Sequence, residues 1–81
     1  MPEEELKQVI LALEEMLEDS TVPRNVKKKI SEAKEMLEED TETSIKVNKA
    51  LHELDDISND VNLQSYTRAQ IWNVVSLLEK V

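Results

Sequence analysis

The sequence predicts an all-α protein, a single-domain up-down four-helix bundle. Glycine is absent from the 81 residues, and there are only two prolines. Apolar residues recur at spacings of three and four, which is typical of amphipathic helices and not of strands. The connections between the helical segments are short, so consecutive helices should be antiparallel neighbours. One domain is therefore expected over residues 1–81, with helices at about 2–19, 22–39, 42–58 and 64–81.

The first helix, at about 2–19, begins with a favourable N-terminus. Pro2 suits the first helical position, and the acidic run Glu3–Glu5 lies where the helix dipole favours anions. The helix is followed by Asp19-Ser20-Thr21-Val22-Pro23, where Thr21 or Val22 is the expected cap of the next helix. Its apolar residues form one stripe: Leu6, Val9, Ile10, Leu13, Met16 and Leu17.

The second helix, at about 22–39, is opened by Pro23 and has a thin apolar stripe, so we expect it to be the most peripheral. The third, at about 42–58, is expected to be capped by Thr41 or Thr43. His52 and Asp56 point away from its apolar face. The stripes of these helices are Val26, Ile30, Ala33 and Leu37 in the second, and Val47, Ala50, Leu51, Leu54 and Ile57 in the third.

The fourth helix, at about 64–81, differs from the others in charge. All but one of the 18 acidic residues precede Val61, and Arg68 is the only charged residue from there to Leu78. So apolar and uncharged a segment predicts the inner helix of the bundle. Before it, Asn59 and Asn62 are substitutes for a left-handed glycine cap. Asp60 or Ser65 is the expected N-cap of this last helix.

Composition narrows the classes of function. The net charge of −8 opposes binding to nucleic acids and to anionic membranes. Cysteine is absent, so disulfides and thiolate metal sites are excluded. There is no basic-then-apolar leader and no apolar run of about 20 residues. A chain of this size has little room for a deep cavity. We therefore expect a cytoplasmic protein without a cofactor and without membrane contact.

Three segments in the second half of the chain form a pattern: Ile57-Ser58-Asn59-Asp60, Thr67-Arg68 and Ile71-Trp72-Asn73. They resemble the signature of a small archaeal family of unknown function, Uncharacterised Protein Family 0147, and the earlier Thr21–Asn25 is similar to that family's first inter-helix turn. The resemblance covers the whole chain. It implies an all-helical bundle in an archaeal cytosol and brings no catalytic residues with it. The sequence departs from the family pattern at Val61 and Gln64, where prolines are common, and at Tyr66.

Trp72 is the first candidate for function. At about 100° per residue, it lies roughly 130° from the apolar centre of the fourth helix. The interpretation we favour is that this helix is central and that Trp72 packs against a second neighbour inside the monomer. The alternative is an anchor on a surface for a partner or for self-association, since tryptophan and arginine are frequent in binding hot spots. That candidate surface comprises Arg68, Trp72, Ser76 and Glu79.

The second candidate is the basic cluster formed by Arg24, Lys27, Lys28 and Lys29, as a phosphate-binding or nucleic-acid patch. No aromatic residues interleave with it for base stacking. Cations are also unfavourable at a helix N-terminus, so acidic residues of the first helix are expected to neutralise them. These are Glu14, Glu15, Glu18 and Asp19. A neutralised surface is the interpretation we favour.

Residues for catalysis or metal binding are few. The acidic runs have neither the glycine nor the spacing of a calcium loop. The residue three before His52, the only histidine, is Lys49, so the Glu-x-x-His pairs of di-iron bundles are missing. Nothing raises the pKa of a carboxylate on a polar helix face. We therefore expect neither an enzyme nor a metal protein.

The sequence thus favours an interaction or structural module that binds an unknown protein partner, or itself through the fourth helix as a homo-oligomer. The alternative is an accessory protein of a nucleic-acid complex that contacts phosphates through the basic cluster.

Overall fold

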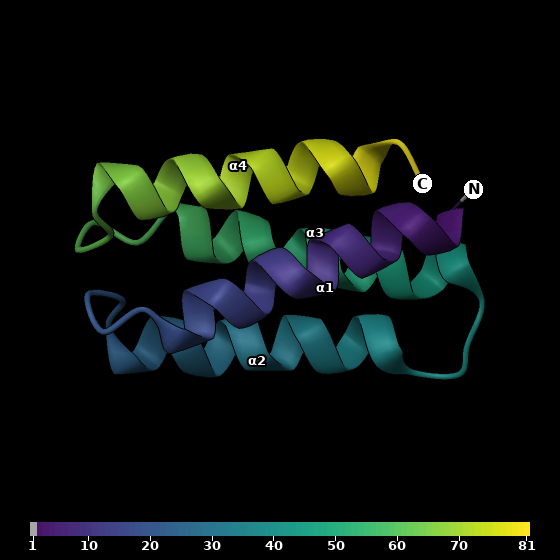
Figure 1. Cartoon of the computed structure of the whole chain (residues 1–81), viewed down its shortest axis with the longest axis horizontal. Helices are drawn as coiled ribbons and strands as arrows, with labels where there is room; N and C mark the ends of the chain where they lie inside the picture. Colours follow the sequence, from purple (N-terminus) through teal and green to yellow (C-terminus); the bar gives the residue numbers. More distant parts are fainter. Residues whose placement is uncertain (1) are drawn as a thin grey trace.

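The computed structural model describes residues 2–81 and confirms the four-helix bundle. The helices are α1 (Pro2–Glu18), α2 (Arg24–Glu38), α3 (Thr43–Ser58) and α4 (Ser65–Glu79). They run alternately in opposite directions, so the chain ends and the α2–α3 connection lie at one end of the bundle (Figure 1). The α1–α2 and α3–α4 connections share the other end.

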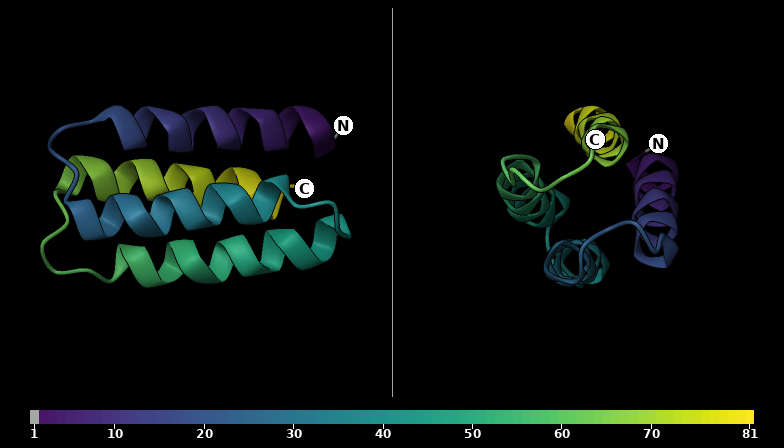
Figure 2. Two further views of the ribbon diagram at one scale, coloured as in Figure 1. Left: turned by 90° about the horizontal axis from the view of Figure 1, so that it is seen from below. Right: turned by 90° about the vertical axis from the view of Figure 1, so that its left-hand side faces the viewer.

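Seen end-on, the helices stand at the corners of a square (Figure 2). Both α1 and α3 pack against α2 and α4. Within residues 2–81 the diagonal pairs, α1 with α3 and α2 with α4, make no backbone contact. Every helix therefore has two neighbours and one outward side. The predictions that the fourth helix is inner and the second peripheral are both wrong, because in a square bundle all four positions are equivalent.

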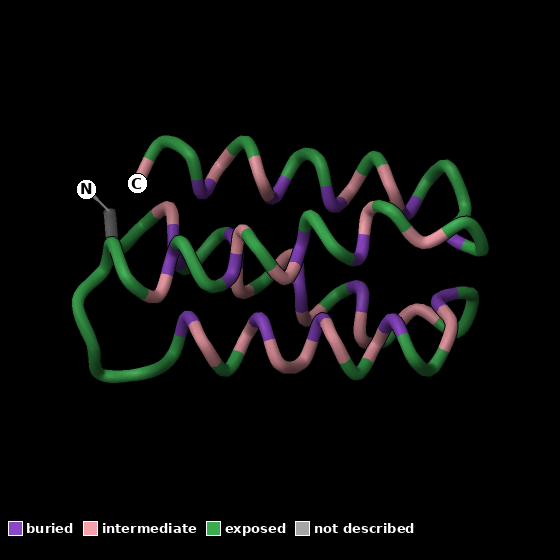
Figure 3. Tube along the Cα trace, turned by 180° about the vertical axis from the view of Figure 1, so that it is seen from behind, coloured by how far each residue is buried: buried purple, intermediate pink, exposed green. Residues whose placement is uncertain are grey.

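The core is one stripe from each helix, turned toward the axis of the bundle (Figure 3). The stripe predicted for α2 is buried throughout. Ile10 and Leu17 of α1 and Leu51 of α3 are only partly buried, because they lie at the margins of their stripes. The buried residues of α3 are Val47, Ala50, Leu54 and Ile57, and those of α4 are Thr67, Ile71, Val74 and Leu78.

The predicted side-chain caps are wrong. The residues at the N-cap positions of α2, α3 and α4 make no side-chain cap hydrogen bond; they are Pro23, Glu42 and Gln64. Thr21 instead donates from its backbone N and its Oγ1 to Asp19 Oδ1, at 2.9 and 2.7 Å. The Val22 side chain is buried in the core. These turns are held by local hydrogen bonds and by packing, so the helices begin without the expected Thr41, Thr43 or Ser65 caps.

The C-terminus of α3 also differs from expectation. Asn59 has φ −86° and ψ −2°, in the right-handed helical region. No residue from 2 to 81 has the positive φ of a left-handed cap, Asn62 included. The α3–α4 connection is held by side chains from other helices.

Candidate interaction surfaces

Arg68 of α4 holds the end of α3. Its Nε donates to the carbonyl oxygen of Ser58 at 3.1 Å, and its Nη2 donates to the carbonyl oxygen of Asp60 at 2.8 Å. Carbonyls at a helix C-terminus lack partners within their own helix. Arg68 therefore acts as a C-terminal cap supplied by the neighbouring helix. Arg68 is part-buried and its guanidinium is bound within the molecule, so its place on a partner surface stays a prediction.

Asp60 joins three elements at the same end of the bundle. Its Oδ1 accepts a hydrogen bond from the backbone N of Asn62 at 2.9 Å. Its Oδ2 accepts one from Asn25 Nδ2 of α2 at 3.3 Å. Asp60, expected as a cap for α4, instead fixes the connection and ties it to the start of α2. Most of the segments on which the family resemblance rests therefore meet here, in a structural role.

Trp72 lies outside the core. Its side chain is 58% exposed, so the interpretation that it packs against a second neighbour inside the monomer is wrong. The reason is the square arrangement: α4 meets α1 on one flank and α3 on the other, and Trp72 points away from both the core and the α1 flank. Of the candidate surface, Ser76 and Glu79 are exposed together with it.

The outer face of α4 is unusual for this molecule because it carries no charge over most of its length. Tyr66 on this face is 68% exposed. Between Ser65 and Leu78 the only charged side chain is Arg68, which is engaged with the α3–α4 connection. We define the outer face of α4 as the exposed residues Ser65, Tyr66, Ala69, Trp72, Asn73 and Ser76.

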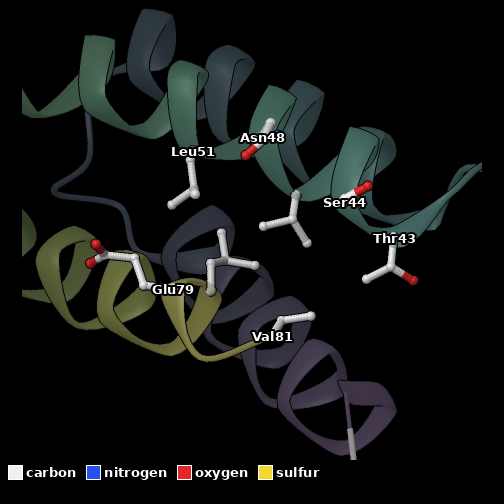
Figure 4. Close-up of a pocket in the computed structure, with 8 residues that line it drawn as sticks. Thr43, Ser44, Asn48, Leu51, Glu79 and Val81 are labelled. Atoms are coloured by element: carbon white, nitrogen blue, oxygen red, sulfur yellow. The ribbon is translucent and has the colours of Figure 1, made fainter.

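A groove runs between α3 and α4, beside this face. One hollow of about 560 Å³ lies at the end where the chain terminates, between the start of α3 and the end of α4 (Figure 4). A second, of about 320 Å³, adjoins it and includes His52, Asp55 and Val75. Asn48, Leu51 and Glu79 line both hollows, so they form one depression, the α3–α4 groove.

Sequence reasoning missed this groove because it assigned Leu51 to the core face. The signal for it is a second stripe on each helix. Ser44, Asn48, Leu51 and Asp55 in α3 follow one another at spacings of four, three and four. The same spacing relates Arg68, Trp72, Val75 and Glu79 in α4.

Lys29 is set apart from the rest of the basic cluster. Successive helical residues are about 100° apart, so Lys27 and Lys29 lie on opposite flanks of α2. Lys29 Nζ pairs with Asp56 Oδ2 of α3 at 2.7 Å, which corrects the expectation that helix one supplies its partner. Arg24 and Lys28 are exposed on the outer side.

Glu14 of α1 and Asp19 of the following turn nevertheless interact with lysines of α2. Glu14 pairs with Lys34 at 3.5 Å, although Lys34 lies outside the cluster. The pKa of Asp19 is lowered, first by its hydrogen bonds from Thr21 and to a smaller extent by the charge of Lys27. No ion pair within residues 2–81 therefore joins α1 to the basic cluster, which corrects the expectation that helix one neutralises it.

No group of three or more His, Asp or Glu side chains in residues 2–81 is placed to hold a metal ion. No helix in the same range is both long enough and apolar enough to cross a membrane.

The fold and these surfaces define a small, purely helical bundle with an uncharged outward helix face. Residues 1–81 match the model of an uncharacterised protein family, UPF0147, and the chain belongs to that family. This confirms the resemblance noted in the sequence.

Relatives from archaea match over nearly the whole chain. A UPF0147 protein of Methanocaldococcus jannaschii is 49% identical over 81 residues, which cover 99% of this chain and 87% of that protein. One from Archaeoglobus fulgidus is 41% identical and covers 100% and 93%. The crystal structure of MMP1188, a protein of unknown function, is similar with a TM-score of 0.95 and 41% identity, covering 100% of this chain and 93% of that one.

Proposed function

We propose that this protein is a non-enzymatic interaction module that binds another protein through the outer face of α4. The observation that carries the proposal is Trp72, the only tryptophan, which is 58% exposed on a well-packed bundle. Tryptophan has a large area to bury and is enriched among the residues that dominate binding energy. The exposed part of the Trp72 indole contributes no burial of apolar area to the folding of the monomer.

The surroundings of Trp72 support the same proposal. Interface centres are depleted in charged residues and enriched in aromatic ones. The outer face of α4 has both properties, with Tyr66 as a second exposed aromatic residue. The outward residues of α1, by contrast, include Glu3, Glu4, Glu15 and Glu18.

The alternative, an accessory protein of a nucleic-acid complex, has less support. One of its four basic residues, Lys29, is paired with Asp56. The net charge of −8 opposes the approach of a polyanion. Binding to phosphates would also weaken steeply with salt, which gives this alternative its own test.

Affinity capture from a lysate of the native organism, with nuclease present, tests the proposal. The variants are Trp72→Ala and, as a matched control, Leu11→Ala. Leu11 is 60% exposed on α1, so both substitutions remove a large exposed apolar side chain without disturbing the core. We expect a stoichiometric protein partner that Trp72→Ala loses and Leu11→Ala retains. A partner that both variants retain, or one that vanishes on nuclease treatment, would contradict the proposal.

A further inference from the structure

We infer that the α3–α4 groove binds an amphipathic helix of the partner protein. The apolar stripe of that helix is flanked by lysine or arginine. This inference rests on the proposed function, because it names the class of partner segment and its position beside Trp72. It is carried by the spacing of the groove residues, by their burial and by their charge.

The spacing matches what a third helix needs. Helices that pack as a coiled coil place contact residues at alternating spacings of three and four. In α3 one such stripe already faces the core, and a second, from Ser44 to Asp55, borders the groove. In α4, Val75 and Glu79 line the groove, and Trp72 precedes Val75 by three residues on the adjoining outer face. The additional stripes of α3 and α4 border the same groove. Together they offer the ridges and holes into which a docked helix can pack.

The groove has an apolar floor, and it is long enough for a docked helix. Leu51 and Val75, on opposite sides of the seam, are only partly buried by the monomer. Val81 adds apolar surface at the end shown in Figure 4. From Ser44 to Asp55 the α3 wall rises through eleven residues, about 16 Å at 1.5 Å per residue. This length accommodates about three turns of a docked helix.

Charge selects the partner. Asp55 on the α3 wall and Glu79 on the α4 wall are the charged residues among those lining the groove, with His52 beside Asp55. Neither carboxylate belongs to an ion pair within residues 2–81, and none of the described lining residues is a lysine or an arginine. A helix with cations on both flanks of its apolar stripe is complementary to these walls. A second copy of this chain would approach against a net charge of −8.

Three synthetic helical peptides of about 14 residues, or four turns, provide the probe. One carries leucine at heptad contact positions with flanking lysine, the second has glutamate in place of lysine, and the third is a scramble of the first. Binding is followed by Trp72 fluorescence and by backbone amide chemical shifts. We expect the cationic amphipathic peptide alone to bind, to shift Trp72 emission to shorter wavelength and to perturb amides of α3 and α4.

Charge reversal supplies the specificity test. The double substitution Asp55→Lys and Glu79→Lys should weaken the cationic peptide about tenfold or more. The matched control is Glu15→Lys with Glu18→Lys on exposed positions of α1, which changes the net charge equally and should leave the affinity nearly unchanged. An equal loss of peptide affinity in the two double variants would overturn the inference, because the attraction would then depend on the net charge of the protein and not on the groove.

Other results would also overturn it: no binding at millimolar peptide, equal binding of the glutamate or scrambled peptide, or shifts confined to α1 and α2. A concentration-dependent dimer in sedimentation that the Asp55, Glu79 double variant dissociates would replace the partner helix with a second copy. The capture assay separates this inference from the proposed function. If Trp72→Ala loses the partner while the Asp55, Glu79 double variant keeps it, the outer face of α4 stands as the contact surface and the groove does not.

Discussion

Arg68 reaches from α4 to the carbonyl oxygens that end α3, and Asp60 links the same connection to the start of α2. A planar guanidinium has several fixed donors, so two of its nitrogens can each bind a different carbonyl oxygen. Residues of the family motif therefore have an explicit task in this chain, which is to close one end of the bundle.

Arg68→Ala should lower the free energy of unfolding by about 1–3 kcal/mol, the range for hydrogen bonds to charged groups and for carbonyls left without partners. Urea unfolding followed by circular dichroism measures this. Arg24→Ala, an exposed arginine outside any ion pair of residues 2–81, is the control and should change stability little. Equal effects of the two substitutions would show that the Arg68 cap contributes nothing.

Gln70 of α4, unlike Arg68, has a buried polar atom that is not hydrogen-bonded. Within the described chain, its Oε1 is the buried side-chain polar atom that has no hydrogen-bond partner. A buried acceptor without a donor costs free energy that an apolar side chain of similar volume does not. Gln70→Met should therefore raise the free energy of unfolding by about 1 kcal/mol, measured in urea, whereas Gln8→Met on the exposed side of α1 should have little effect. A loss of stability of about this size in Gln70→Met would contradict the interpretation that Gln70 Oε1 is buried without a donor.

At the scale of elements, the Lys29–Asp56 pair links α2 to α3. The Lys29 ammonium, through its hydrogen bond and its charge, lowers the pKa of the Asp56 carboxyl below its ordinary value of 3.8. Asp56 in turn raises the pKa of Lys29 above its ordinary 10.5, first through that hydrogen bond. Because the folded-state pKa of Asp56 is lowered, its contribution to stability is present above the ordinary value and is lost as the pH falls through the lowered one.

Asp56→Asn should therefore be less stable than the wild type at neutral pH, and the difference should shrink as the pH is lowered from about 5 to 2. Both side chains are exposed to solvent, so the difference should be small and should fall with added salt. Asp55→Asn removes the same charge from a side chain outside the ion pairs, and controls for net charge. A pH-independent difference between the wild type and Asp56→Asn would contradict the pairing.

Helix number, order and core stripes were predictable because apolar spacing alone defines them; α2 buries the stripe predicted, Val26, Ile30, Ala33 and Leu37. The helix wheel also placed Trp72 off the core. The inference that a helix with few charged residues must be buried was wrong. The scarcity of charge in α4 predicts an inner helix, whereas in the structure it belongs to an exposed, uncharged face. No pattern in one chain distinguishes these two cases.

The turns were the least predictable part. Capping by Thr43, Asp60 or Ser65 is a local rule, but Asp60 is instead bonded to Asn25, 35 residues away in sequence. Arg68, ten residues from Ser58, replaces a left-handed cap. Such contacts depend on how the helices are brought together, which short-range signals do not contain.

Over the whole molecule, charge and apolar surface are separated. The acidic residues lie almost entirely before Val61, while α4 presents aromatic and small uncharged side chains. The excess of acidic residues lies before Val61, whereas Arg68 and Glu79 are the charged side chains of α4. The account therefore depends on Trp72 being accessible on a folded monomer.

Fluorescence of Trp72, the only tryptophan, tests that claim directly. The measurement is the emission maximum and the quenching by acrylamide, in native buffer and over a dilution series. We expect the long-wavelength emission of a solvated indole, quenched readily at every dilution. Short-wavelength emission that resists the quencher at the lowest protein concentration would place Trp72 in the core and contradict the account.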